Sequence, residues 1–306
     1  MRHKAGVADL DADVAYEPRA RSVSLGATTG PGQIAYFDYG PADRAPDLVF
    51  LHANGFNACA YRTILAPLAD DLRIITPDQR GHGATTLATD RPRTSWLDLR
   101  DDLLAFLDAM GIESVALAGH SMGGTASLLA AAEAPSLVRA LALFDPVIRP
   151  PGPIPAGSSE AMLDSPMIAG AIRRRRSFPS RAAAVEGYRG RGAFRTWTEA
   201  MLADYVGAGF HDTPDGAVEL ACTPEWEVSN YVNQGHDSWS AFERSVCPIR
   251  ILRAETESPG RIDGHTDTLT ASGRIRIDTI PGTTHFLPME RPELVREAIW
   301  EAVRAP

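Results

Sequence analysis

The chain has 306 residues, of which 44% are hydrophobic and 23% charged, as in an ordinary soluble domain. Its net charge of −9 argues against a nucleic-acid partner, because no overall basic field is available to displace phosphate counterions. Three widely spaced cysteines, at positions 59, 222 and 247, match neither a zinc-ligand spacing nor a disulfide framework. This pattern favours a reducing, cytoplasmic location.

The N-terminal segment has no apolar core that would serve as a secretion signal. We expect residues 1–20 to form a flexible arm. Nowhere does the chain approach the roughly 20 consecutive apolar residues that a membrane span requires. The sequence therefore predicts no membrane association.

Short apolar runs alternate with longer amphipathic segments along most of the chain. An antiparallel hairpin is predicted first, near residues 23–39. The following short runs, most of them continuous and apolar, predict strands: Leu48–Leu51, Ile74–Thr76, Val115–Ala118, Leu141–Phe144, Ile249–Leu252 and Ile275–Ile280. Amphipathic patterns predict helices over 95–110, 122–134 and 292–303, the first with Thr94 or Ser95 as its N-cap. Such alternation indicates a parallel, doubly wound sheet with right-handed crossovers.

The alternation stops after Phe144 and resumes near Ile249. About a hundred residues without strand signals indicate a mostly helical insertion, including an aromatic helix candidate over 194–210. We interpret the four arginines at 173–176 as a solvated helix face on an acidic protein rather than as a nucleic-acid site. The expected organisation is a core of residues 21–146 and 241–306, with the helical insertion over 147–240.

The stretch VALAGHSMGGTASL, residues 115–128, runs from a predicted strand through a turn into a predicted helix. Ser121 lies on that turn, with Gly119 and Gly123 two residues away on either side, which is the nucleophile-elbow pattern. This position also lies at the positive end of a helix dipole, which favours a developing oxyanion. The alternative is a plain glycine-rich turn with an incidental serine, but the strand–turn–helix context favours a nucleophile.

Four segments occur in an order and spacing that resemble a known family: FLHANGF, DQRGHGAT, GHSMGG and PGTTHFLPMERPE. From about Val23 to the C-terminus the chain resembles the α/β-hydrolase superfamily, in the serine hydrolase branch that carries a helical cap. The resemblance implies a doubly wound, mostly parallel, eight-stranded sheet of the α/β class. It also implies that the insertion is a cap placed after the sixth strand.

A serine hydroxyl needs a neighbouring base to take its proton. The resemblance implies the chain order serine, acid, histidine, which makes His285 the expected base. The acid has two candidates. Asp145 ends the predicted strand 141–144, whereas Glu257 follows the next predicted strand, where the family most often places its acid. We favour Asp145, because a shorter carboxylate at a strand terminus is better fixed, and keep Glu257 as the alternative.

The resemblance further implies an oxyanion hole made by the backbone N–H groups of Asn54 and Met122. Ala53 stands where the family pattern usually has a glycine, and the side-chain amide of Asn54 is a further candidate donor. The expected substrate-binding residues are Phe56, His120, Trp197 and Phe286.

A serine at the elbow argues against dehalogenase or epoxide hydrolase chemistry, for which the family uses aspartate. The expected reaction is hydrolysis of a carboxylic ester, thioester or lactone through an acyl-serine intermediate. The alternatives are a carbon–carbon bond hydrolase, a cofactor-free perhydrolase, and a non-enzymatic ligand receptor. No phosphate loop, dinucleotide fingerprint or zinc motif is present, so we expect no cofactor and no metal. The expected partner is a small-molecule substrate, and the expected state is a monomer or homodimer.

Overall fold

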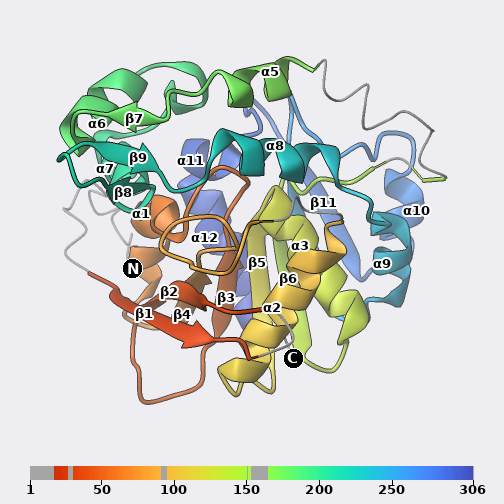
Figure 1. The fold of residues 1–306 in the computed structure, drawn as a ribbon. Coiled ribbons are helices and arrows are strands. Elements are labelled where there is room, and N and C mark those ends of the chain that lie inside the picture. The colour runs from red at the N-terminus through yellow and green to blue at the C-terminus, as the bar shows by residue number, and fades with distance from the viewer. Residues whose placement is uncertain (1–16, 27–29, 91–94, 150, 153–164, 306) are drawn as a thin grey trace, which may run out of the picture.

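The computed structural model describes residues 17–26, 30–90, 95–149, 151–152 and 165–305 (Figure 1). Its centre is a sheet with the strand order β1-β2-β4-β3-β5-β6-β10-β11. The first two strands and β4 are antiparallel neighbours, and the other pairs are parallel. The bounds are β1 (Arg19–Ser24), β2 (Gln33–Tyr39), β3 (Leu48–Leu51), β4 (Ile74–Pro77), β5 (Val115–His120), β6 (Val138–Phe144), β10 (Ile249–Ala254) and β11 (Ile275–Ile280). The predicted α/β fold with a mostly parallel, eight-stranded sheet is confirmed.

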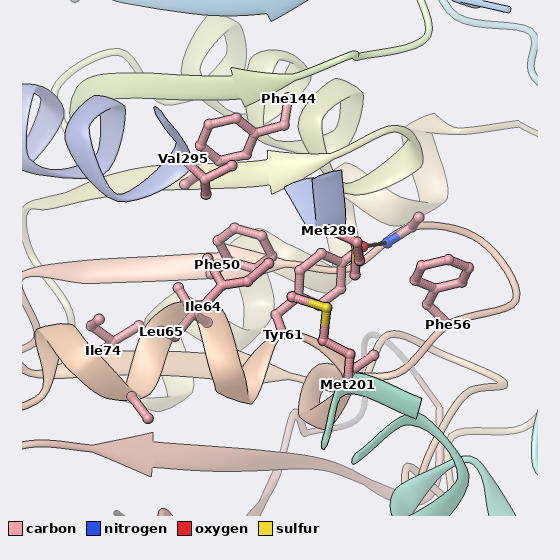
Figure 2. Packing of buried hydrophobic residues seen from close by; sticks show 14 of the residues in the cluster. Phe50, Phe56, Tyr61, Ile64, Leu65, Ile74, Phe144, Met201, Met289 and Val295 are labelled. Atoms are coloured by element: carbon pink, nitrogen blue, oxygen red, sulfur yellow. Dashed lines mark hydrogen bonds between the residues drawn. The ribbon is translucent and has the colours of Figure 1, made fainter. Parts of the chain in front are cut away.

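Helices cover both faces of this sheet. Two hydrophobic clusters of buried residues form the core, and successive residues of β3 belong to different ones: Phe50 to the first and Leu51 to the second. The first cluster includes α1 (Arg62–Leu65) and α12 (Pro292–Val303), as Figure 2 shows at close range. The second includes α2 (Leu97–Ala109), α3 (Met122–Glu133) and α9 (Ser238–Arg244). Alternation of side chains along each strand therefore divides the core between the two faces.

Several helices and strands begin or end a few residues away from the predicted positions. Strand β1 begins at Arg19, inside the segment expected to be a flexible arm, because Arg19–Ser24 pair with β2. Residues 1–16 lie outside the described part of the chain. Helix α2 begins at Leu97 with Trp96 at its N-cap, and the Ser95 hydroxyl accepts the Leu97 N–H at 3.1 Å. The predicted N-cap is therefore displaced by one residue, and Thr94 lies outside the described residues.

Most of the described part of the segment between β6 and β10 lies over one end of the sheet, whereas α9 packs beside α3 (Figure 1). It contains α5 (Pro166–Ile172), α6 (Arg181–Tyr188), α7 (Glu199–Ala208), α8 (Pro224–Val232) and α9. Three short strands, β7 (Ser177–Phe178), β8 (Phe210–Asp212) and β9 (Val218–Leu220), form a second sheet in the order β7-β9-β8. The sequence did not predict these strands, because two or three residues are too few to show an alternating pattern.

The turn from β5 into α3 is held in a strained conformation. Ser121 has φ 54° and ψ −117°, which L-residues rarely adopt. A Cβ atom at Gly119 would lie 2.5 Å from the backbone carbon of Gly123, and one at Gly123 would lie 2.4 Å from the carbonyl oxygen of Leu51. These contacts explain why the elbow requires glycine on both sides of the serine.

Replacement of Gly119 by alanine is expected to lower the free energy of unfolding by about 2–3 kcal/mol, because the new methyl group overlaps backbone that has no free space to move into. Urea denaturation measures the change. The matched control is Gly207→Ala in α7, where a Cβ atom meets nothing within 4 Å and alanine is the better helix former. Equal losses in the two variants would contradict the steric explanation of the elbow.

Candidate active site

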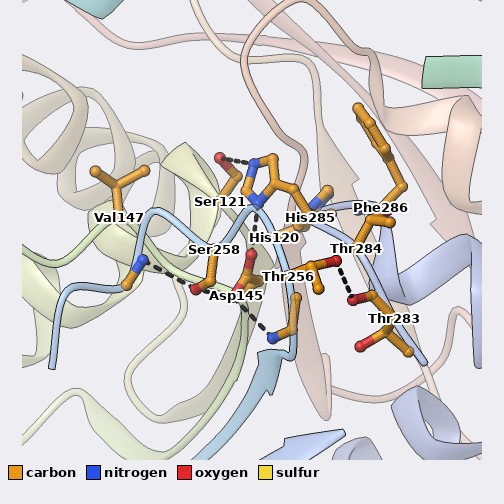
Figure 3. A network of polar contacts seen from close by, with 12 residues as sticks. His120, Ser121, Asp145, Val147, Thr256, Ser258, Thr283, Thr284, His285 and Phe286 are labelled. Carbon is orange, nitrogen blue, oxygen red and sulfur yellow. Dashed lines mark hydrogen bonds and ion pairs between the residues drawn. The ribbon is translucent and has the colours of Figure 1, made fainter. Parts of the chain in front are cut away.

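Three side chains from distant parts of the chain form one hydrogen-bonded row at the carboxyl ends of the strands (Figure 3). The Oγ atom of Ser121 lies 2.9 Å from Nε2 of His285. The Nδ1 atom of His285 lies 2.6 Å from Oδ2 of Asp145. Ser121 follows β5, Asp145 follows β6, and His285 follows β11. The parallel sheet explains this meeting, because neighbouring parallel strands deliver their following residues to the same edge.

Asp145 is a buried carboxylate, with its side chain 0% exposed. Its Oδ1 atom accepts the Ala254 N–H at 3.0 Å and the Ser258 hydroxyl at 2.6 Å. Its own N–H donates to the carbonyl oxygen of Leu252 at 2.8 Å. Both carboxylate oxygens therefore have hydrogen-bond donors, as a buried charge requires.

Of the two candidate acids, the structure brings Asp145 and not Glu257 to His285. Glu257 is exposed, and it lines the cavity in front of Ser121. Its backbone has φ 58°, in the left-handed region.

Asn54 and Met122, the two expected oxyanion donors, line the same cavity as Ser121. Met122 is the first residue of α3, so its N–H has no acceptor within the helix. The side chain of Asn54 is engaged elsewhere. Its Oδ1 atom accepts from Asn230 at 2.8 Å, and its Nδ2 atom donates to the carbonyl oxygen of Glu227 at 2.9 Å. The amide therefore joins the loop after β3 to α8, which leaves the backbone N–H of Asn54 as the group suited to an oxyanion.

A cavity of about 540 Å³ opens over Ser121 between the core and the inserted segment. Phe56, His120 and Phe286 line it, as expected. Trp197 is not among its lining residues and instead packs against Phe56, with ring centroids 5.2 Å apart. Phe194, an aromatic residue that the sequence offered as a pocket candidate, lines it too, whereas four aromatic residues of the lining were not predicted: Trp96, Tyr188, Tyr205 and Tyr231. Most of these come from the inserted segment, where no motif distinguishes a lining residue from a packing one.

The arginine run at 173–176 differs from its prediction. These residues follow α5 instead of forming a helix face, and the side chain of Arg174 is only 16% exposed. Arg174 forms an ion pair with Glu227 and donates a hydrogen bond to the Tyr205 hydroxyl. The Tyr205 hydroxyl in turn donates to the carbonyl oxygen of Gly55 at 3.1 Å. Arg174 is thus a paired charge in the cavity wall, an arrangement that depends on contacts more than 30 residues apart.

His120 belongs to a second row of buried hydrogen-bonded groups, and the donors and acceptors along this row can be arranged in only one way. The Ala53 N–H donates to the Tyr61 hydroxyl at 3.1 Å, and that hydroxyl donates to Nδ1 of His120 at 2.8 Å. Nε2 of His120 then donates to the carbonyl oxygen of His285 at 2.7 Å. Burial lowers the pKa of His120 to about 3, so the ring stays neutral at neutral pH. Because both ring nitrogens are occupied, His120 supports the loops of Asn54 and His285 and offers a ligand only its ring surface.

Within the described residues, no group of three or more His, Cys, Asp or Glu side chains is arranged to hold a metal ion. Nor does any helix in that part of the chain have the length and hydropathy needed to cross a membrane.

The fold and the site together define a hydrolase built on a doubly wound sheet. The chain belongs to the alpha/beta hydrolase family, whose model matches residues 48–298.

Comparisons with individual proteins agree with this assignment. The chain is 24% identical over 264 residues to the 2-(acetamidomethylene)succinate hydrolase of Mesorhizobium japonicum, covering 85% of this chain and 88% of that protein. A crystal structure of E-2-(acetamidomethylene)succinate hydrolase superposes with a TM-score of 0.75 at 21% identity, covering 94% of this chain and 100% of the other. A thermophilic esterase from Thermogutta terrifontis gives a TM-score of 0.66 at 22% identity, covering 94% and 98%. At these identities the structural likeness shows the fold.

The row through His120 leads to a prediction about stability. Tyr61→Phe removes the hydroxyl that joins Ala53 to His120, leaving a buried N–H and a buried ring nitrogen without their partner. The expected loss in the free energy of unfolding is about 2 kcal/mol, measured by urea denaturation. Tyr188→Phe is the matched control, because the Tyr188 hydroxyl is buried without a hydrogen-bond partner in the described structure. A loss for Tyr61→Phe no larger than for Tyr188→Phe would show that the row does not support the fold.

Proposed function

We propose that the protein is a serine hydrolase that cleaves a carboxylic ester, thioester or lactone through an acyl-serine intermediate. The observation that carries the proposal is the hydrogen bond of 2.9 Å between Ser121 and His285, on a histidine whose other nitrogen bonds to the buried Asp145. A nucleophile, a base and an orienting acid in this order form a catalytic triad. The strained backbone of Ser121 supports the same role, because such strain clusters at functional sites.

In the proposed reaction, Nε2 of His285 takes the hydroxyl proton as Oγ of Ser121 attacks the substrate carbonyl carbon. Asp145 stabilises the imidazolium that results, and the N–H groups of Met122 and Asn54 stabilise the negative charge on the carbonyl oxygen. The tetrahedral intermediate collapses as His285 returns the proton to the departing alcohol, thiol or lactone oxygen. Water then attacks the acyl-serine, with His285 again as base, which releases the acid and restores the hydroxyl of Ser121.

The cavity points to the substrate class. Aromatic and aliphatic side chains make up most of its wall, and the charge of Arg174 is paired with that of Glu227. Such a wall suits a mainly apolar acyl or alcohol group, because an apolar surface gains free energy when it leaves water. We propose that residues 147–240 act as the cap that encloses this group.

Ser121→Ala is expected to lower ester turnover by about 10³-fold or more with the fold intact, because it removes the nucleophile. A chromogenic short-chain ester measures turnover, and mass spectrometry after treatment with a fluorophosphonate measures the covalent label on Ser121. His285→Ala should lose nearly as much, and the double variant should be little worse than either single one, since the two groups act as a unit. Ser272→Ala, an exposed serine on the surface, is the control. Retained turnover in Ser121→Ala, or no label on Ser121 in the unmodified protein, would overturn the proposal.

Asp145→Asn and Glu257→Gln test which carboxylate is the acid, since each removes the charge while keeping the size. Asp145→Asn should lower kcat by about 10²- to 10⁴-fold, because the imidazole then adopts the wrong tautomer and its cation is less stable. Glu257→Gln should lose less than about tenfold, because Glu257 is not a hydrogen-bond partner of His285. The opposite ranking of the two kcat values would move the acid role to Glu257.

A further inference from the structure

We propose that Ser258 is a positioning residue for catalysis, acting through Asp145. The inference rests on the proposed function, in which Asp145 orients His285. The Ser258 hydroxyl lies 2.6 Å from Oδ1 of Asp145 and accepts the Gly260 N–H at 3.1 Å (Figure 3). An ionised carboxylate only accepts hydrogen bonds, so the Ser258 hydroxyl proton lies on the bond to Asp145.

The two oxygens of Asp145 have separate tasks. Oδ1 accepts two hydrogen bonds, from the Ala254 N–H and the Ser258 hydroxyl, while Oδ2 accepts from Nδ1 of His285. Two donors on one oxygen fix the carboxylate plane, and this plane sets the direction of the bond to the imidazole. Because Asp145 is fully buried, solvent does not replace a missing donor. Without the Ser258 hydroxyl the carboxylate gains freedom to rotate, and the imidazole is held less firmly against Ser121.

The loop that carries Ser258, residues 255–260, is also bound to the segment before His285. The N–H and the hydroxyl of Thr256 both donate to the carbonyl oxygen of Thr283, each at 3.1 Å. The loop thus contacts the acid on one side and the segment leading to the base on the other. Glu257, with its φ of 58°, lies between these two anchors. Its left-handed backbone is strained, and the anchors on both sides hold it in place.

This geometry gives the loop after β10 a defined part in the site. The family most often places its acid in this loop, and here the acid is one strand earlier. The loop instead supplies Oδ1 of that acid with the Ala254 N–H and the Ser258 hydroxyl.

Ser258→Ala is expected to lower kcat about tenfold, as for loss of one hydrogen bond to a charged group. KM should change little, because Ser258 is not among the residues that line the cavity. Rates are divided by the number of active sites titrated with a fluorophosphonate. A merely structural role would reduce the titre of active sites and leave the rate per site unchanged.

Two further variants test whether the hydroxyl of Ser258 is the group that matters. Ser258→Thr keeps the hydroxyl and should restore kcat to within about threefold of the original protein. Ser272→Ala, which removes an exposed hydroxyl elsewhere on the surface, is the control and should keep kcat. Failure of threonine to restore kcat would overturn the role of the Ser258 hydroxyl.

A double-mutant cycle tests whether Ser258 acts through Asp145. In the Asp145→Asn background, Ser258→Ala should lower kcat by less than about twofold, because the two residues act in one chain. Additive losses would overturn the inference. Its failure is distinguishable from failure of the proposed function: if the unmodified protein neither hydrolyses esters nor labels at Ser121, the function fails. If it does both and Ser258→Ala matches it, only the inference fails.

Discussion

A buried negative charge sets the arrangement of the site. Asp145 has no exposure to solvent, and its carboxylate is stable there only with donors on both oxygens. Those donors come from β10, from the loop after β10 and from His285. The same need for partners therefore binds the ends of three adjacent strands, β6, β10 and β11, into one unit. The N–H of Ser121, which donates to the carbonyl oxygen of Phe144 at 2.9 Å, attaches β5 to that unit.

The sequence predicted the parts of the fold in which local pattern and tertiary position agree. Strand β3 and helix α12 begin and end at the predicted residues, because a buried parallel strand is a continuous apolar run and α12 has a regular apolar stripe. Strand β11, at the edge of the sheet, also has the predicted bounds, and its sequence IRIDTI alternates apolar and polar residues over most of its length. Ser121 and His285 were likewise predicted as site residues from short local motifs. The glycines of the elbow are required by backbone contacts under 3 Å, so the local sequence records the constraint directly.

Other features had no local signal. The choice between Asp145 and Glu257 depends on which loop approaches His285 in the folded chain. Asp145 and His285 are separated by 140 residues in the sequence, so no local pattern records their contact. The contacts of Arg174 with Glu227 and Tyr205 likewise join separate elements of the inserted segment. A charge run has the same composition whether it faces water or a cavity, so the prediction of a solvated face failed at this one arginine. Strands β7, β8 and β9 were missed because each gains its stability from pairing rather than from pattern.

Two buried histidines, His120 and His52, make the stability of the folded state depend on pH. Burial lowers the pKa of His120 to about 3 and that of His52 to about 4, both below the value of about 6.5 for a free histidine. When the pH falls below about 6.5, these two histidines therefore bind protons in the unfolded chain but stay neutral in the folded chain. Each ring then costs the folded state about 1.4 kcal/mol for every pH unit of acidification, until its lowered pKa is reached. Two histidines that do no chemistry in the proposed reaction thus make the stability of the fold decrease from about pH 6.5 downward, at a higher pH than that at which carboxylates titrate.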